Sequence, residues 1–327
     1  MAVNFGTSPG ADSTAVFGLY KDVFEEGIAE GVNNSNPLQD VFKREKVDYK
    51  GGKGHTFIAH VGRNPSPMFV AEEGAFAGSG AQRHIQGTVD IRKIMARLRL
   101  TQEAMDDSVD SEAAWKSAKK DEMTRIIDDI ARREEFATST DGKGVFCLLN
   151  GAPTTLVVAV KNPGNIVNTA FGNRFLQRGM YLAAVNPATG LLRAGIVKVV
   201  DTLDAGTSFT PDAIPNNAWA DGDYLVQAAN SSVTDMLDTA YEKAYWGLPA
   251  LVDDGTNRAT YFGINRSGAP SYKSYVVAAA GAVATDAMQR SADVVYQKLG
   301  GEIDLLLMHP SVRREYIKLS EADRRYG

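Results

Sequence analysis

The chain has 327 residues, 44% of them hydrophobic and 23% charged, which is the composition of a globular protein large enough for two or three domains. Its formal net charge of -5 argues against a dedicated nucleic-acid binder, because binding to phosphates needs a basic surface. The single cysteine, Cys147, excludes an intramolecular disulfide framework, and its apolar neighbours favour a buried structural thiol over a nucleophile. The sequence shows no signal peptide and no apolar stretch of about 18 residues that could span a membrane.

The N-terminal part of the chain predicts segments that reach outward. Residues 1–46 carry apolar side chains at mixed spacing, which favours an arm with one or two short helices that packs on another surface. Residues 47–86 predict a long hairpin loop, with a strand-like run at 55–61, a turn with two prolines at 64–67, and a run rich in Gly, Ala and Ser at 74–81. Loops of this length are usually functional or disordered, and we expect this one to touch another molecule.

A strand and a long helix are predicted next. Apolar residues alternate with charged ones over residues 91–100, which is the period of a half-buried strand. Residues 111–138 repeat apolar side chains at steps of three and four, and acids precede bases by four residues, as in Asp128 and Arg132. The expected helix is roughly 40 Å long. Its apolar stripe needs an equally long partner, and the predicted strand is expected to supply part of it.

The second half of the chain predicts a β-rich region followed by mixed structure. Residues 142–230 contain short β-branched runs separated by turns, which is typical of a small barrel or sandwich inserted between helical regions. Residues 231–327 predict helices at 236–245 and 288–299, an apolar strand at 303–308 and a final helix. This last region is expected to form a compact α/β or α+β module.

No catalytic, metal-binding or cofactor-binding motif emerges from the sequence. The four histidines are far apart in the chain and do not follow the spacing of metal ligands. The Asp253-Asp254-Gly255 stretch lacks the alternating oxygen ligands of a calcium loop. Phosphate-loop and Gly-x-Ser-x-Gly patterns are missing as well. We therefore expect a protein that is not an enzyme and holds no metal or cofactor, although an enzyme is not excluded.

Two stretches resemble a known family. Residues 98–108, before the long helix, read LRLTQEAMDDS, and residues 305–316, near the end, read LLLMHPSVRREY. Together with the order of the predicted elements, they resemble the major capsid proteins of tailed bacteriophages. The shell fold of that family is shared with encapsulins and with the capsid floor of herpesviruses. The likeness covers most of the chain and is weakest in the β-rich region.

The resemblance implies an α+β architecture, the tailed-phage capsid shell fold. Its parts are an N-terminal arm, an extended β-hairpin loop, a peripheral domain with a long spine helix, an inserted β-barrel-like domain and an axial α/β domain. The corresponding segments are residues 1–46, 47–86, 87–141, 142–230 and 231–327. The resemblance also implies strands that follow the His-Pro segment and return to the peripheral domain, and the sequence up to Gly327 contains none.

By the same resemblance, the chain is a structural subunit that self-assembles into hexamers and pentamers of an icosahedral capsid around double-stranded DNA. The implied partners are copies of itself, a scaffolding protein, a portal, a decoration protein and non-specifically bound packaged DNA. The implied location is the virion, assembled in the host cytoplasm, with no membrane. Two alternatives stay open: an encapsulin-like compartment with an enzyme cargo, and a soluble enzyme or carbohydrate-binding protein that uses the β-rich insert.

The expected contacts between subunits come from the loop and from the charged face of the long helix. They are Lys50, Lys53, Met68 and Phe69 in the loop and Arg125, Arg132 and Arg133 on the helix. Some family members join subunits through an isopeptide bond between a loop lysine and an asparagine. Lys50 and Lys53 lie in the right loop for this role, but ordinary solvated lysines are the simpler interpretation. The three arginines are expected to be solvated or to contact neighbouring subunits or the packaged genome.

Overall fold

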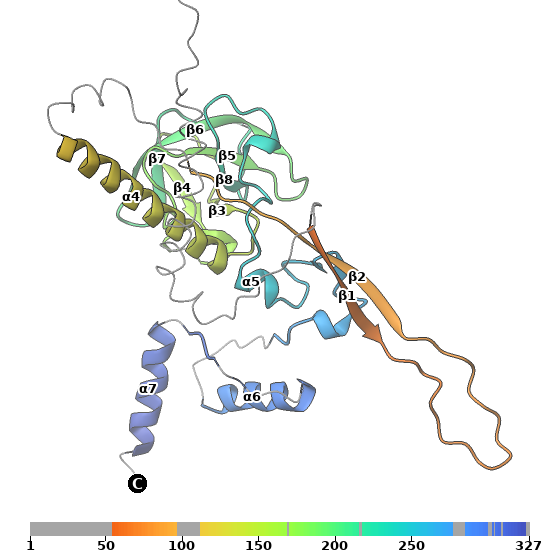
Figure 1. Cartoon of the computed structure of the whole chain (residues 1–327). Coiled ribbons are helices and arrows are strands. Elements are labelled where there is room, and N and C mark those ends of the chain that lie inside the picture. Colours follow the sequence, from red (N-terminus) through yellow and green to blue (C-terminus); the bar gives the residue numbers. More distant parts are fainter. Residues whose placement is uncertain are drawn as a thin grey trace, which may run out of the picture. The chain divides into compact units, whose positions relative to one another are not determined.

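The computed structural model of the protein describes residues 54–96, 112–168, 170–215, 218–276, 285–299, 303, 305–308 and 310–324 (Figure 1). The chain divides into two compact units, Met1–Lys273 and Ser274–Gly327. The first unit holds a β-barrel, the long helix α4, a β-hairpin and a small module of turns. The second unit holds two helices.

Six antiparallel strands form a closed barrel in the order β3-β4-β7-β6-β5-β8. They are β3 (Val145–Leu149), β4 (Val158–Lys161), β5 (Tyr181–Val185), β6 (Leu192–Thr202), β7 (Ser208–Pro211) and β8 (Tyr224–Ala228). Gly190 and Gly222 have positive φ angles in two of the turns, where a side chain would be strained. Closure pairs the edges of the sheet, so the barrel is a self-contained scaffold.

Side chains on both faces of β3, β5 and β8 are buried or half-buried, whereas β4 and β6 expose residues on one face. The interior is filled by large apolar side chains that are almost completely buried: Phe146, Leu149, Leu182, Phe209 and Leu225. The next residues along the same strands, such as Val145 and Ala183, belong to a second buried cluster that includes Val233 from the segment after β8. Burial on two faces explains why β3 reads as a continuous apolar run, VFCLL, rather than as an alternating pattern.

Helix α4 spans Glu112–Ser139, which confirms the helix predicted at residues 111–138. Its last turns pack on the barrel through Phe136. The Phe136 ring centroid lies 5.0 Å from that of Phe146 and 4.8 Å from that of Phe175. This aromatic cluster attaches the end of the helix to the barrel.

The predicted hairpin is confirmed. Strands β1 (Gly54–Gly62) and β2 (Arg83–Asp90) pair antiparallel, and residues 63–82 between them form a long loop without helix or strand (Figure 1). We call the two strands and this loop the β1–β2 arm. Phe57 lies opposite Gly87, and the absence of a side chain there leaves room for the aromatic ring.

One face of the β1–β2 arm packs on a small module of turns. The module contains α5 (Leu248–Leu251), β9 (Thr260–Tyr261), β10 (Ile264–Asn265) and a 3-10 turn at Pro270–Tyr272. Ala59 of the arm is buried together with Ile264 and Ala269. The amide of Thr88 donates a hydrogen bond of 2.9 Å to the carbonyl of Phe262. These contacts anchor the base of the arm.

A buried ion pair holds the module together. The Arg266 guanidinium lies 3.5 Å from the Asp253 carboxylate and donates to the carbonyls of Asp253 and Ala250, the latter at 2.6 Å. Both charged side chains are almost completely buried. Buried charges persist when they are paired and hydrogen-bonded, so this pair fixes the loop that follows α5.

The second unit contains α6 (Thr285–Leu299) and α7 (Pro310–Arg324). They confirm the helices predicted at residues 288–299 and at the end of the chain. Further 3-10 turns lie in the first unit at Pro163–Asn165 and Met236–Asp238.

The expected α+β capsid shell fold is wrong. The main core of the described structure is a closed six-stranded antiparallel barrel rather than a spine helix that joins two domains. The region at residues 142–230, interpreted as an insert, supplies the largest buried core. Helix α4 has the predicted length, and its last turns pack on the barrel and its flanking segments.

Three local predictions are also wrong. Strand β2 ends at Asp90, and residues 91–96 form no strand, while the rest of the strand expected at 91–100 lies outside the described residues. Only a 3-10 turn forms within the helix expected at 236–245. The described residues of 303–308 form no strand. An apolar run becomes a strand only when a neighbouring strand accepts its backbone hydrogen bonds, which periodicity does not reveal.

Candidate functional site

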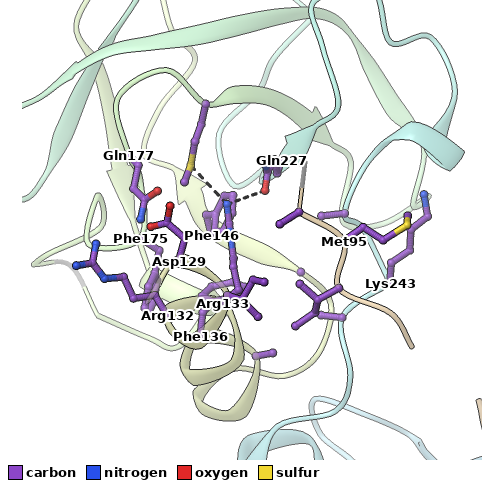
Figure 2. A pocket seen from close by; sticks show the side chains of 18 of the residues that line it. Met95, Asp129, Arg132, Arg133, Phe136, Phe146, Phe175, Gln177, Gln227 and Lys243 are labelled. Carbon is purple, nitrogen blue, oxygen red and sulfur yellow. Dashed lines mark hydrogen bonds between the residues drawn. The ribbon is translucent and has the colours of Figure 1, made fainter. Parts of the chain in front are cut away.

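A cavity of about 960 Å³ lies where the last turns of α4 meet the barrel and the segment that follows β2 (Figure 2). Seven cationic side chains line it: Arg92, Lys93, Arg132, Arg133, Arg174, Arg178 and Lys243. Three acidic side chains line it as well: Asp129, Glu135 and Asp238. We call this cavity the basic pocket. Its excess of positive charge is local, since the whole chain has a net charge of -5.

The floor of the basic pocket is apolar and aromatic. Phe136 of α4, Phe146 of β3 and Phe175 line it together with the thioether of Met180. Figure 2 shows the three phenylalanines close to Arg132 and Arg133 of α4. A ligand with both apolar and acidic groups would match this floor and its charged surroundings.

Arg133 points into the basic pocket and joins helix to barrel. Its guanidinium donates a 2.7 Å hydrogen bond to the Gln227 side-chain oxygen and lies 4.8 Å from the Phe146 ring centroid (Figure 2). Burial lowers the pKa of Arg133 from its ordinary value, and the nearby Asp129 carboxylate partly opposes this effect. The expectation that Arg133 belongs to the solvated outer face of the helix is therefore corrected, because it packs on the barrel.

Other cations at the basic pocket remain open to a ligand. Arg132, Arg174 and Arg178 are exposed, and among the described residues no carboxylate lies within ion-pair distance of them. The Arg178 side chain donates to the Val200 carbonyl at 2.6 Å, which fixes its direction but leaves its charge uncompensated. Such arginines can bind carboxylates through paired hydrogen bonds.

The loop of the β1–β2 arm carries exposed acidic side chains, in contrast to the basic pocket. At its tip, residues 68–77, Phe69 is fully exposed and Phe76 is 91% exposed. Glu72 and Glu73 lie between them, are exposed, and form no ion pair with any described residue. Large apolar side chains that are exposed together indicate a surface that binds another molecule. We call residues 68–77 the arm tip.

The structure places the sequence-predicted contact residues in different settings. Met68 and Phe69 lie in the arm tip. Arg132 and Arg133 line the basic pocket, whereas Arg125 is exposed on α4 and is not part of it. Lys50 and Lys53 lie outside the described residues.

Sequence reasoning missed two parts of this site. Glu72 and Glu73 stand between two aromatic residues in an otherwise small and apolar stretch, and that contrast is visible in the sequence. Arg174 and Arg178 are four residues apart in a loop before β5, and nothing local indicates that they face α4.

Within the described part of the chain, no group of three or more His, Cys, Asp or Glu side chains is placed to hold a metal ion. None of the helices described there combines the length and the apolar character of a membrane span. Comparisons with family models, with curated proteins and with solved structures found no match for this chain.

Proposed function

We propose that the protein is a structural subunit that assembles with copies of itself into hexamers and pentamers of a closed icosahedral shell, as in a phage capsid around double-stranded DNA. The observation that carries this proposal is the complementarity between the arm tip and the basic pocket. One is apolar and acidic, and the other is apolar and basic. The proposed partner of each surface is a second copy of the chain.

The arm tip gains stability only by contact with another surface. Phe69 and Phe76 are exposed to solvent in the single chain. Burial of each ring would contribute about 1.5–3 kcal/mol. The aromatic floor of the basic pocket offers a matching apolar surface, and the exposed Arg132 and Arg174 offer charges for Glu72 and Glu73.

Contacts of this kind generate rings. The arm tip and the basic pocket are different surfaces of one molecule, so a chain of copies would join head to tail. A head-to-tail contact closes into a ring when the rotation between neighbouring copies is a whole-number fraction of 360°. Slightly different rotations then give rings of five or of six copies. A shell needs such complementary surfaces and does not depend on one particular fold.

The charge of the chain fits a container for DNA. A strongly basic wall would hold packaged DNA through counterion release and hinder its exit. The net charge of -5 avoids this. In this proposal the basic pocket is used between subunits, so its local positive charge is covered on assembly.

A charge-exchange experiment tests the proposal on the full chain, with scaffolding protein added if assembly requires it. Negative-stain microscopy and sedimentation velocity are expected to show rings or shells for the unmodified protein. Glu72→Lys/Glu73→Lys and Arg132→Glu/Arg174→Glu should each reduce assembly at least tenfold, and the combination of all four should restore part of it. The matched control for Glu72→Lys/Glu73→Lys is Asp201→Lys/Asp204→Lys, which makes the same change of charge at exposed positions of the barrel and should assemble normally.

Two outcomes would contradict the proposal in different ways. If the unmodified protein forms only monomers or dimers even with scaffold, the shell function is wrong. If shells form and all three charge variants assemble normally, the arm tip and the basic pocket do not form the contact.

A further inference from the structure

We propose that the β1–β2 arm binds a divalent transition-metal ion of the Zn²⁺ or Ni²⁺ class through His60 and His84. These residues are directly opposite each other in the register of β1 and β2. Their ring centroids are 5.2 Å apart. Neutral imidazole is a preferred ligand of zinc, nickel and copper ions. The site is independent of the proposed shell function.

The two imidazoles share the exposed face of the arm. Ala59 and Ile85, which are also opposite each other, point to the other face and pack on the module at the base of the arm. Because side chains alternate along a strand, His60 and His84 are turned to solvent, and both are exposed. An ion can therefore reach them without rearrangement of the core.

The spacing of the rings suits one shared ion. Two imidazoles bound to a tetrahedral ion at the usual Zn–N distance of about 2.0–2.1 Å have centroids roughly 5 Å apart. The observed 5.2 Å agrees with this value. Cross-strand pairing thus supplies two nitrogen ligands with little movement of the backbone.

A neighbouring side chain holds the His60 ring in the absence of an ion. Nε2 of His60 and the side-chain oxygen of Gln82 form a hydrogen bond of 2.6 Å, which an ion bound at Nε2 would replace. The protein ligands are then two imidazoles, with the remaining positions for water. The site contains fewer than three His, Cys, Asp or Glu side chains. Its affinity for the ion should therefore be lower than that of a structural zinc site with four protein ligands.

The position of the site indicates its effect. The register of the two strands shifts between His60 and Gly62, immediately before the chain leaves the hairpin for the loop. An ion bound by His60 and His84 would tie the strands together at the point where the loop begins. We expect metal binding to slow hydrogen exchange of the amides at the loop end of β1 and β2.

The test uses the full chain without a histidine tag. Titration with Zn²⁺ and with Ni²⁺, followed by calorimetry, should show one ion per chain, and His60→Ala or His84→Gln should weaken binding at least tenfold. His55→Ala is the matched control, because His55 lies on the same strand opposite Val89 and should not affect binding. Hydrogen exchange of the β1 and β2 amides should slow with metal in the unmodified protein and not in the His60→Ala variant.

Either of two results would overturn the proposal. One is the absence of saturable binding in the unmodified protein. The other is binding of unchanged affinity and stoichiometry in the double variant His60→Ala/His84→Ala, which would place the ion elsewhere. Circular dichroism of each variant verifies that the chain is folded before the comparison is made.

Discussion

The guanidinium carbon of Arg133 lies 4.8 Å from the centroid of the Phe146 ring, so a cation from helix α4 rests on an aromatic ring of the barrel. The same guanidinium donates to Gln227 on β8. Helix α4, the next strand β3 and the distant strand β8 therefore meet at one side chain. This junction forms a wall of the basic pocket and gives the first prediction.

Arg133→Ala should lower the free energy of unfolding by about 1–2 kcal/mol, because it removes the cation–π contact and the hydrogen bond to Gln227. Urea denaturation followed by fluorescence or circular dichroism measures this change. Arg132→Ala is the neighbouring control. Its side chain is exposed, so its effect should stay within about 0.5 kcal/mol. Equal losses in the two variants would contradict the role assigned to Arg133.

Phe136→Ala should cost about 3–5 kcal/mol, since it leaves a cavity between α4 and the aromatic rings of the barrel. The ring of Phe136 is buried against Phe146 and Phe175. Thermal unfolding of the unassembled chain is the measurement. Phe69→Ala removes an equal ring from the exposed arm tip and should leave the melting temperature unchanged.

Arg266→Met should destabilise the protein by about 3–5 kcal/mol, because it leaves the buried Asp253 carboxylate without its partner. The double variant Arg266→Met/Asp253→Leu removes both charges and should recover part of this loss. Chemical denaturation of the three proteins gives the comparison. If the double variant were less stable than Arg266→Met, the unpaired carboxylate would not be the cause.

Asp221 gives a prediction about pH. Its carboxylate accepts a 2.8 Å hydrogen bond from Lys161, which with the amide of Gly151 lowers the pKa of Asp221 below its ordinary value of 3.8. A carboxyl with a lower pKa in the folded state stabilises the fold above its unfolded-state pKa, and this contribution is lost as the pH falls through the folded-state pKa. The melting temperature should therefore decrease as the pH is lowered below about 4. This decrease should be less steep in the Lys161→Met variant. An identical pH profile in the variant would contradict the assignment.

Cys147 offers a probe of barrel opening. The thiol is completely buried in β3, and burial raises its pKa well above the ordinary value. Since the thiolate is the reactive form, a thiol reagent should react very slowly with the native protein and completely after denaturation. The chain has one cysteine, so the colour released by the reagent reports this site alone. Rapid reaction under native conditions would show that β3 opens.

Local patterns predicted the elements whose stability is local. The apolar steps and charge pairs of residues 111–138 predicted α4 within one residue at each end. A strand-like run at residues 55–61, followed by prolines and glycines, predicted the hairpin and its long loop, although no pattern located its second strand, β2. The determining contacts of the helix lie within a few residues, whereas β1 and β2 pair across the loop at residues 63–82.

The candidate site could be predicted only in part. Met68 and Phe69 were expected to meet another molecule because of their loop; both are exposed in the structure, and their contact with another molecule stays a prediction. Arg133 was placed on the wrong face, although it lies three residues before Phe136 and therefore shares its side of the helix. The sequence also placed His60 and His84 far apart, because their pairing depends on the register of the hairpin.

Local sequence patterns were sufficient to predict the long helix, the hairpin loop and the β-rich character of residues 142–230. The tertiary structure decided that six short strands close into a barrel, that α4 ends on its aromatic side chains, and that cations from several segments gather around one pocket. The physical reason is the range of the interactions. Helix and turn preferences act between near neighbours, whereas strand pairing and pocket formation depend on which distant segments complete each other's hydrogen bonds and apolar surfaces.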